Sequence, residues 1–102
     1  MTESSTKKKS ILIADDSLYY RQSIRKYLQD DYIIYDAANI KDTLQILHDH
    51  DDISLVIIDL ALPDSGGFAL MQQMQQDSTL RAIPLAAMTS SLESSVTIQA
   101  LQ

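Results

Sequence analysis

The chain has 102 residues, of which 45% are hydrophobic and 22% are charged, and it contains no cysteine. These values fit one globular domain and exclude wholesale disorder, disulfide bonds and thiolate chemistry. The formal net charge of −6 disfavours nucleic acid as a partner, because phosphate binding needs a basic surface. No apolar stretch is long enough to span a membrane and no signal peptide is evident, so a cytoplasmic location is expected by default.

The elements are expected to alternate along the chain. Residues 1–9 are polar and predict a flexible tail that ends in the solvated basic run 7–9. From residue 10 onwards, short apolar runs alternate with helical patterns. Strands are expected at about 10–14, 32–35, 55–58 and 84–88, each followed by a helix.

This alternation predicts an α/β fold with a doubly wound parallel sheet and helices on both faces. The strands at 10–14 and 55–58 are continuous apolar runs, as expected of central strands that are covered on both faces. In open sheets of this kind, ligands bind at the carboxyl ends of the strands.

Several polar residues are expected to have structural roles. Ser17 and Asn39 are predicted to cap the first and second helices, and Ser90 with Glu93 forms a capping box for the fourth. The segment 62–67 holds both glycines of the chain and predicts a turn. The two histidines, His48 and His50, are expected at the solvated end of the second helix. The five tyrosines are expected to be partly buried packing residues, and they are Tyr19, Tyr20, Tyr27, Tyr32 and Tyr35.

Acidic residues stand where two of the predicted strands end. Asp15 and Asp16 follow the first strand, and Asp59 follows the third. Three carboxylates at one edge of a sheet repel each other unless a cation joins them, and Mg²⁺ prefers oxygen ligands. A carboxylate is ionised at neutral pH and can attack phosphorus without a general base. Thr89 ends the fourth strand, and its hydroxyl is expected to donate to a phosphoryl oxygen.

Each of these residues also has an ordinary structural explanation. Asp15 and Asp16 can be capping acids in an exposed loop, and Asp59 can simply begin a loop. Thr89 alone says little, because threonine is common in strands. Their convergence at one edge of the predicted sheet favours a functional site.

Taken together, these residues resemble the receiver domain of two-component response regulators. The resemblance covers about residues 10–102, and Thr89 lies at the family's spacing from Asp59. The match includes the segments 11–17, 36–39, 59–63 and 83–90. Its specificity comes from the combination of the acidic pair, the loop from Asp59 to Pro63 and Thr89, each of which is weak alone. It implies a flavodoxin-like sheet with the strand order 2-1-3-4-5.

The resemblance also implies roles for individual residues. Asp59 would accept a phosphoryl group from a sensor histidine kinase or a phosphotransfer protein. Asp15, Asp16, Asp59 and the backbone carbonyl of Ala61 would hold Mg²⁺, with Asp15 acting through water. Thr89 would contact the phosphoryl group and switch a partner surface. The domain would be a signalling phosphoacceptor and not an enzyme, beyond self-catalysed phosphotransfer and dephosphorylation.

The chain departs from the family pattern in three places. Gly66 stands where the family often has an acid, and Ile40 stands where a glycine often follows the asparagine. The family's fifth strand, with its phosphoryl-binding lysine, and its fifth helix have no counterpart before Gln102. The resemblance thus implies a C-terminally incomplete receiver domain at 10–102. It is expected to be either a fragment of a longer protein with an output domain or a domain completed by association, such as a homodimer.

The sequence is also compatible with two other functions. A non-phosphorylated interaction scaffold with the same fold fits the missing lysine, but the acidic set opposes it. A phosphatase or hydrolase with an aspartyl nucleophile usually needs a second acid two residues after the nucleophile. That position holds Ala61 in this chain.

Overall fold

The structure is a computed structural model that describes residues 8–60, 62 and 66–88. Four parallel strands form one sheet in the order β2-β1-β3-β4. The strands are β1 (Lys9–Ala14), β2 (Tyr32–Ala37), β3 (Ile53–Asp59) and β4 (Leu85–Met88). The helices are α1 (Leu18–Leu28), α2 (Ile40–Asp49), α3 (Gly66–Gln76) and the short 3₁₀ helix η2 (Leu80–Ala82).

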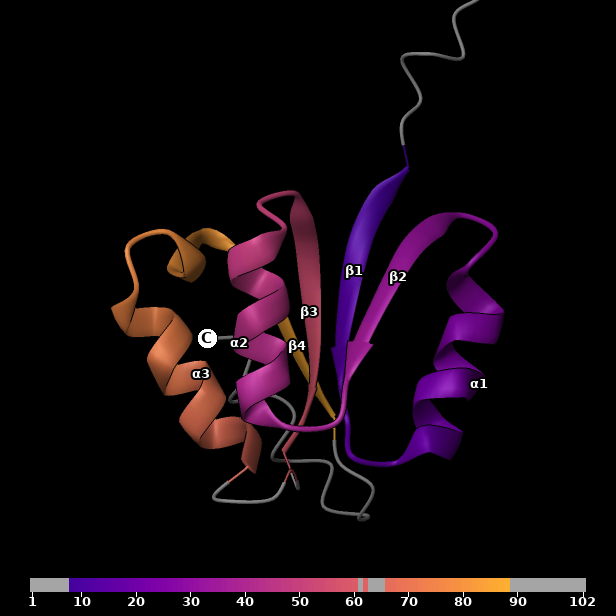
Figure 1. Ribbon diagram of the computed structural model, residues 1–102, viewed down its shortest axis with the longest axis horizontal. Coiled ribbons are helices and arrows are strands. Elements are labelled where there is room, and N and C mark those ends of the chain that lie inside the picture. Colours follow the sequence, from indigo (N-terminus) through magenta and orange to yellow (C-terminus); the bar gives the residue numbers. More distant parts are fainter. Residues whose placement is uncertain (1–7, 61, 63–65, 89–102) are drawn as a thin grey trace, which may run out of the picture.

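Helices cover the sheet on both sides, and all strands run toward the same end. Helix α1 lies on one face, whereas α2 and α3 lie on the other (Figure 1). The predicted α/β fold with a parallel sheet in the order 2-1-3-4 is therefore confirmed. Among the described residues, no helix combines the length and the apolar character that crossing a membrane requires.

The strands differ from the prediction at their ends. Lys9 is exposed but already pairs with Tyr32, so the predicted tail at 1–9 extends one residue too far. Strand β2 continues to Ala37, and β3 begins at Ile53 and includes Asp59. Polar residues interrupt the apolar runs, as Asp36 does before Ala37 and Ser54 does after Ile53, whereas the ladder is made by backbone groups and continues past them.

Among the described residues, two apolar clusters lie on the two faces of the sheet, and a third is formed by Leu60 and Ala87 with Met71 packed against them. Residues that alternate along β1 and β3 point to opposite faces, as strand geometry requires. The cluster toward α2 and α3 includes Leu12, Val56, Ile58, Leu70 and Met74, all at most 1% exposed. The cluster toward α1 is smaller, and its buried members are Ile11, Ile13 and Ile34.

Helix α1 rests on the sheet with a stripe that is only partly apolar. None of its residues is buried, and Ile24 and Leu28 are the members that pack against the smaller cluster. Arg21 and Arg25 lie on the same stripe, because residues three and four apart share a helix face. The tyrosines lie outside this stripe. Their exposed fractions are 73% for Tyr19, 44% for Tyr20 and 85% for Tyr27.

The burial predicted for aromatic and histidine side chains was therefore wrong in part. Tyr19, Tyr20 and Tyr27 are exposed, whereas Tyr32 and Tyr35 are half-buried as predicted. His48 is exposed in the last turn of α2, in agreement with the prediction. His50 is half-buried because its ring packs on Tyr35, with centroids 4.3 Å apart.

Both predicted caps within the described residues are confirmed. The Ser17 hydroxyl accepts a hydrogen bond from the Tyr20 amide at 3.2 Å, and this bond starts α1. The Asn39 side chain accepts one from the Asp42 amide at 2.8 Å, and this bond starts α2. The capping box predicted at 90–93 lies outside the described residues.

The two glycines allow α3 to begin directly against the end of β3. Gly66 has a φ of 62°, a left-handed conformation that favours glycine. A Cβ atom on Gly67 would lie 2.5 Å from Cγ2 of Ile58 and 2.8 Å from the carbonyl oxygen of Asp59. Gly67 therefore sets the close approach between α3 and the strand that carries Asp59.

The substitution Gly67→Ala is expected to destabilise the protein by about 1–3 kcal/mol, because one of the crowded atoms belongs to the backbone and cannot rotate away. Urea unfolding followed by circular dichroism measures this loss. The control is Gln73→Ala at an exposed position of the same helix, which is expected to change stability by no more than about 0.5 kcal/mol. Equal stabilities of the two variants would contradict the role assigned to Gly67.

Candidate functional site

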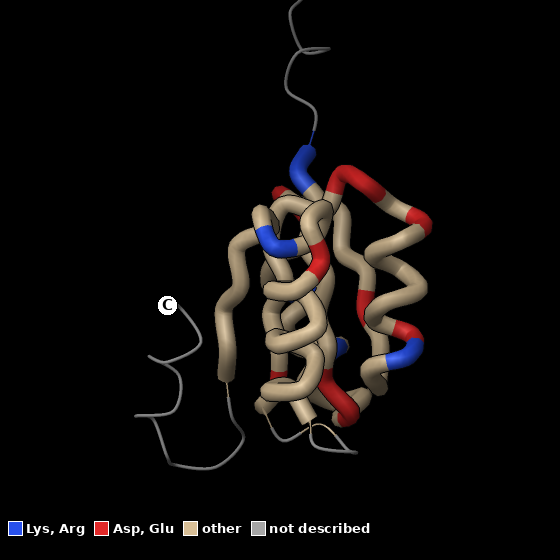
Figure 2. Tube along the Cα trace, turned by 90° about the vertical axis from the view of Figure 1, so that its left-hand side faces the viewer, with Lys and Arg blue, Asp and Glu red and all other residues tan. Residues whose placement is uncertain are grey.

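Three carboxylates meet at the end of the sheet where the strands finish. Asp15 and Asp59 are buried, with exposed fractions of 2% and 3%, whereas Asp16 is exposed. One carboxylate oxygen from each residue lies within 4.8 Å of the others. Acidic residues occur at the end of the sheet that carries these carboxylates and also at the opposite end (Figure 2). Lys and Arg are sparse along the described trace. The two remaining predicted site residues, Ala61 and Thr89, lie outside the described residues.

The pairing of neighbouring strands brings the carboxylates together. Ala14 pairs with Ile58 in the parallel ladder between β1 and β3. The residue that follows each of them in the sequence is an aspartate, Asp15 or Asp59, so the pairing places these two residues side by side. On its other side, Asp59 pairs with Met88 of β4. The amide of Leu60 donates to the carbonyl of Met88 at 2.9 Å, which extends this pairing one residue past the strand.

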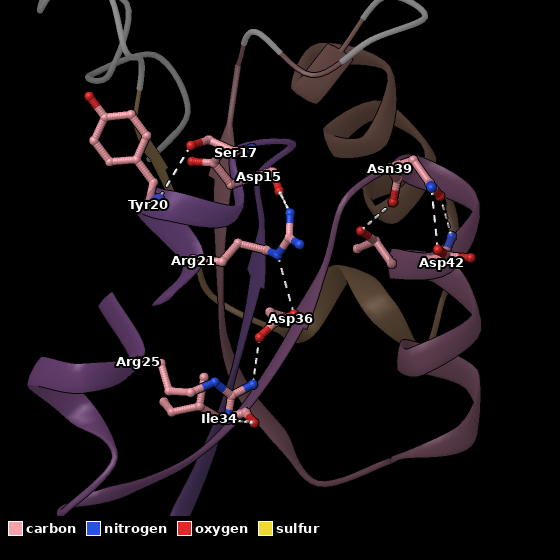
Figure 3. A network of polar contacts seen from close by, with 10 residues as sticks. Asp15, Ser17, Tyr20, Arg21, Arg25, Ile34, Asp36, Asn39 and Asp42 are labelled. Carbon is pink, nitrogen blue, oxygen red and sulfur yellow. Dashed lines mark hydrogen bonds and ion pairs between the residues drawn. The ribbon is translucent and has the colours of Figure 1, made fainter. Parts of the chain in front are cut away.

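Asp15 is held by hydrogen bonds from three directions. Its amide donates to the carbonyl of Ala37 at 3.0 Å, and its side chain accepts from the amide of Ser17 at 2.8 Å. Its carbonyl accepts from Nη1 of Arg21 at 2.7 Å (Figure 3). Asp15 is thus attached to β2, to the turn before α1 and to α1 itself. These contacts fix the turn on which Asp16 also stands.

The electrostatics of the site follow from its burial. Burial raises the pKa of Asp15 above its ordinary value, because the carboxylate loses water. The negative charges of Asp59 and Asp16 and a side-chain hydrogen bond with Asp59 raise this pKa further, and the hydrogen bond from the Ser17 amide lowers it. In the absence of a cation, ionised Asp15 is therefore an unfavourable buried charge.

A divalent cation fits this arrangement. Carboxylate oxygens are hard ligands of the kind that Mg²⁺ selects, and Mg²⁺ needs only one or two direct carboxylates because it keeps several waters. A cation among the three oxygens would compensate the buried charge of Asp15 and its repulsion by Asp59 and Asp16. Asp16, which is exposed, leaves one side of the group accessible from solvent.

A set of polar contacts beside the site did not emerge from the sequence. Arg21 and Arg25 of α1 both pair with Asp36 of β2. The signal that could have revealed them is the spacing of two arginines, four apart, on the same helix stripe as Ile24 and Leu28.

The raised pKa of Asp15 predicts a pH dependence of stability without metal. Because the pKa of Asp15 in the folded state lies above its unfolded value, the contribution of Asp15 is fully present at low pH and is lost as pH rises through the raised pKa. Asp15→Asn is expected to remove this loss and stabilise the protein at neutral pH in EDTA. Asparagine keeps the acceptor for the Ser17 amide.

Urea unfolding in EDTA measures this effect at pH 4, which is near the ordinary pKa of a carboxyl group, and at pH 7, which is well above it. The matched control is Asp30→Asn at an exposed position, which is expected to leave the pH dependence unchanged. A destabilising effect of Asp15→Asn at pH 7 in EDTA would contradict the unfavourable buried charge.

Comparison with known proteins gives the family of this chain. A family model described as the response regulator receiver domain matches residues 11–102. Response regulator Rre1 of Synechocystis sp. is 29% identical over 82 residues, which cover 78% of this chain and 35% of that protein. A glycerol metabolism activator of Pseudomonas putida is 26% identical over 94 residues, which cover 89% of this chain and 42% of that protein. The chain thus spans less than half the length of these two relatives.

A comparison of structures agrees with this result. The chemotaxis response regulator CheY4 of Vibrio cholerae superimposes with a TM-score of 0.80 at 22% identity, over 91% of this chain and 78% of that one. This similarity confirms the flavodoxin-like fold expected from the resemblance. With the match of the family model to nearly the whole chain, it follows that the protein belongs to the response regulator receiver domains.

Proposed function

We propose that this receiver domain is a phosphoacceptor that takes a phosphoryl group on Asp59, with Mg²⁺ bound beside it. The single observation that carries the proposal is the meeting of Asp15, Asp16 and Asp59, with ligand oxygens within 4.8 Å of one another at the carboxyl end of the sheet. A sensor histidine kinase or a phosphotransfer protein is the proposed donor. Phosphorylation would alter contacts with a partner or with an output domain of a longer protein.

The rigidity of the surrounding backbone supports the choice of these residues. Asp59 ends a strand that pairs with β1 on one side and with β4 on the other. The absence of a side chain at Gly67 lets α3 lie close to the carbonyl of Asp59. Phosphoryl transfer depends mainly on positioning and on charge neutralisation, so a carboxylate on a rigid strand end suits the acceptor role.

The acidic group suits Mg²⁺ as the cofactor. Asp16 and Asp59 are the proposed direct ligands, Asp15 acts through water, and the carbonyl of Ala61 completes the set. When bound, Mg²⁺ supplies positive charge that offsets the charge on the phosphoryl oxygens. Asp15 is well fixed, because the amide of Ser17 donates to its side chain and Arg21 donates to its carbonyl.

The remaining proposals rest on the resemblance to the family. Thr89 would contact the phosphoryl group and carry the switch to the partner surface. Receiver domains are signalling modules, so the chain is proposed to act through its partners and not as an enzyme on small molecules. A homodimer and a cytoplasmic location both remain predictions from the sequence.

Incubation with a small phosphodonor and Mg²⁺, followed by intact-mass measurement, tests the function. One phosphoryl group is expected on the wild type and none on Asp59→Asn, because the amide cannot form the acyl phosphate. EDTA is expected to abolish the modification of the wild type. The matched control, Asp51→Asn, changes an exposed aspartate in the turn before β3 and is expected to be phosphorylated normally.

Two outcomes would contradict this proposal. Equal phosphorylation of the wild type and Asp59→Asn would place the phosphoryl group elsewhere. An unmodified wild type that also fails to accept phosphate from a histidine kinase would favour the non-phosphorylated interaction scaffold.

A further inference from the structure

Polar contacts, in addition to apolar packing, attach α1 to the rest of the domain. No residue of α1 is buried, and two arginines occupy part of the stripe that faces the sheet. Both arginines reach Asp36 on β2, and one of them also reaches the turn that carries Asp15 and Asp16 (Figure 3).

Arg21 is the residue that joins this network to the acidic site. Its side chain is 13% exposed, and its Nη1 donates to the carbonyl of Asp15 at 2.7 Å. Its Nε is buried without a hydrogen bond in the described part of the chain, but lies 3.3 Å from Oδ1 of Asp36 as an ion pair. Asp36 therefore compensates the charge of Arg21 and orients the guanidinium toward Asp15.

Arg25 anchors the same aspartate from one helical turn away. Its Nη2 pairs with Oδ2 of Asp36, and its Nη1 donates to the carbonyl of Ile34 at 3.1 Å. The two carboxylate oxygens of Asp36 thus take one arginine each. Arg25 shares the helix, the partner and the charge of Arg21, but within the described part of the chain the polar contacts of its side chain are with Ile34 and Asp36 and not with the turn that carries Asp15.

The bond from Arg21 bears on the metal ligands through the backbone. The amide of Asp15 is held by Ala37, its side chain by Ser17 and its carbonyl by Arg21. Loss of the Arg21 bond would leave this carbonyl free to rotate, and the turn with Asp15 and Asp16 would shift relative to Asp59. Groups that orient metal ligands in this way commonly affect metal affinity about 10–100-fold.

We propose that Arg21 is a positioning residue of the acidic site, which holds the Asp15–Asp16 turn in the geometry that binds Mg²⁺. The inference rests on the proposed function, since it concerns affinity for the proposed cation. It assigns to Arg21 a role beyond attaching α1 to the sheet, a role that Arg25 does not share.

The sign of the effect separates this role from a simple charge effect. Arg21 is a cation close to a cation site, so its charge alone opposes Mg²⁺ binding. Removal of the charge would then tighten Mg²⁺ binding. A positioning role predicts the opposite result, weaker binding, because the ligands lose their alignment.

Calorimetric titration with Mg²⁺ alone provides the test. Arg21→Gln is expected to weaken Mg²⁺ binding about tenfold. Arg21→Lys keeps the charge and can donate to the Asp15 carbonyl, but it lacks the fork that also engages Asp36, so an intermediate affinity is expected. Arg25→Gln is the matched control, with the Mg²⁺ affinity of the wild type. Each titration is run at a temperature at which circular dichroism shows the variant to be folded.

The outcomes distinguish the inference from the function on which it rests. Mg²⁺ binding by the wild type with equal or tighter binding by Arg21→Gln would overturn the positioning role and leave the proposed function intact. An equal loss of affinity in Arg25→Gln would also overturn it, because attachment of α1 would then explain both effects. Failure of the wild type to bind Mg²⁺ would contradict the proposed function itself.

Discussion

The parallel pairing of β1 with β3 is the interaction on which the site depends. Its register sets Ala14 opposite Ile58, and both strands continue into an aspartate. The ladder is built from backbone bonds and is buried under helices on both faces, so the two carboxylates have little freedom to separate. Burial, together with the repulsion between the carboxylates, raises the pKa of Asp15, and the apolar clusters on both faces must offset that cost.

The sequence was sufficient to predict the parts of the fold that depend on apolar burial. Continuous apolar runs marked β1 and β3, and the acids that follow these runs marked the end of the sheet at which Asp15, Asp16 and Asp59 meet. Ser17 and Asn39 were recognisable as caps because capping depends on a local hydrogen bond. Predicting these features requires only the local pattern of apolar and polar residues and the rule that parallel strands end at the same edge of the sheet.

The sequence was insufficient where a role depends on which neighbours a residue meets. The tyrosines of α1 were expected as partly buried packing residues, but they are exposed, and arginines share the stripe that faces the sheet. Gly67 was predicted in a turn at 62–67, but it lies in the first turn of α3, and its close approach to the Asp59 carbonyl depends on how α3 packs against β3. Long arginine side chains bury their stems while their heads reach polar partners, so a hydrophobic pattern does not reveal them.

The polar attachment of α1 has a thermodynamic consequence for signalling. If the bond from Arg21 to the Asp15 carbonyl favours the geometry that binds a cation, a bound cation must favour that bond by the same free energy. Attachment of α1 and occupancy of the acidic site are then linked through one backbone carbonyl. Helix α1 has no buried residue and is attached in part by Arg21, Arg25 and Asp36. Under this linkage, the surface of α1 with its exposed tyrosines would respond to the state of the carboxylates.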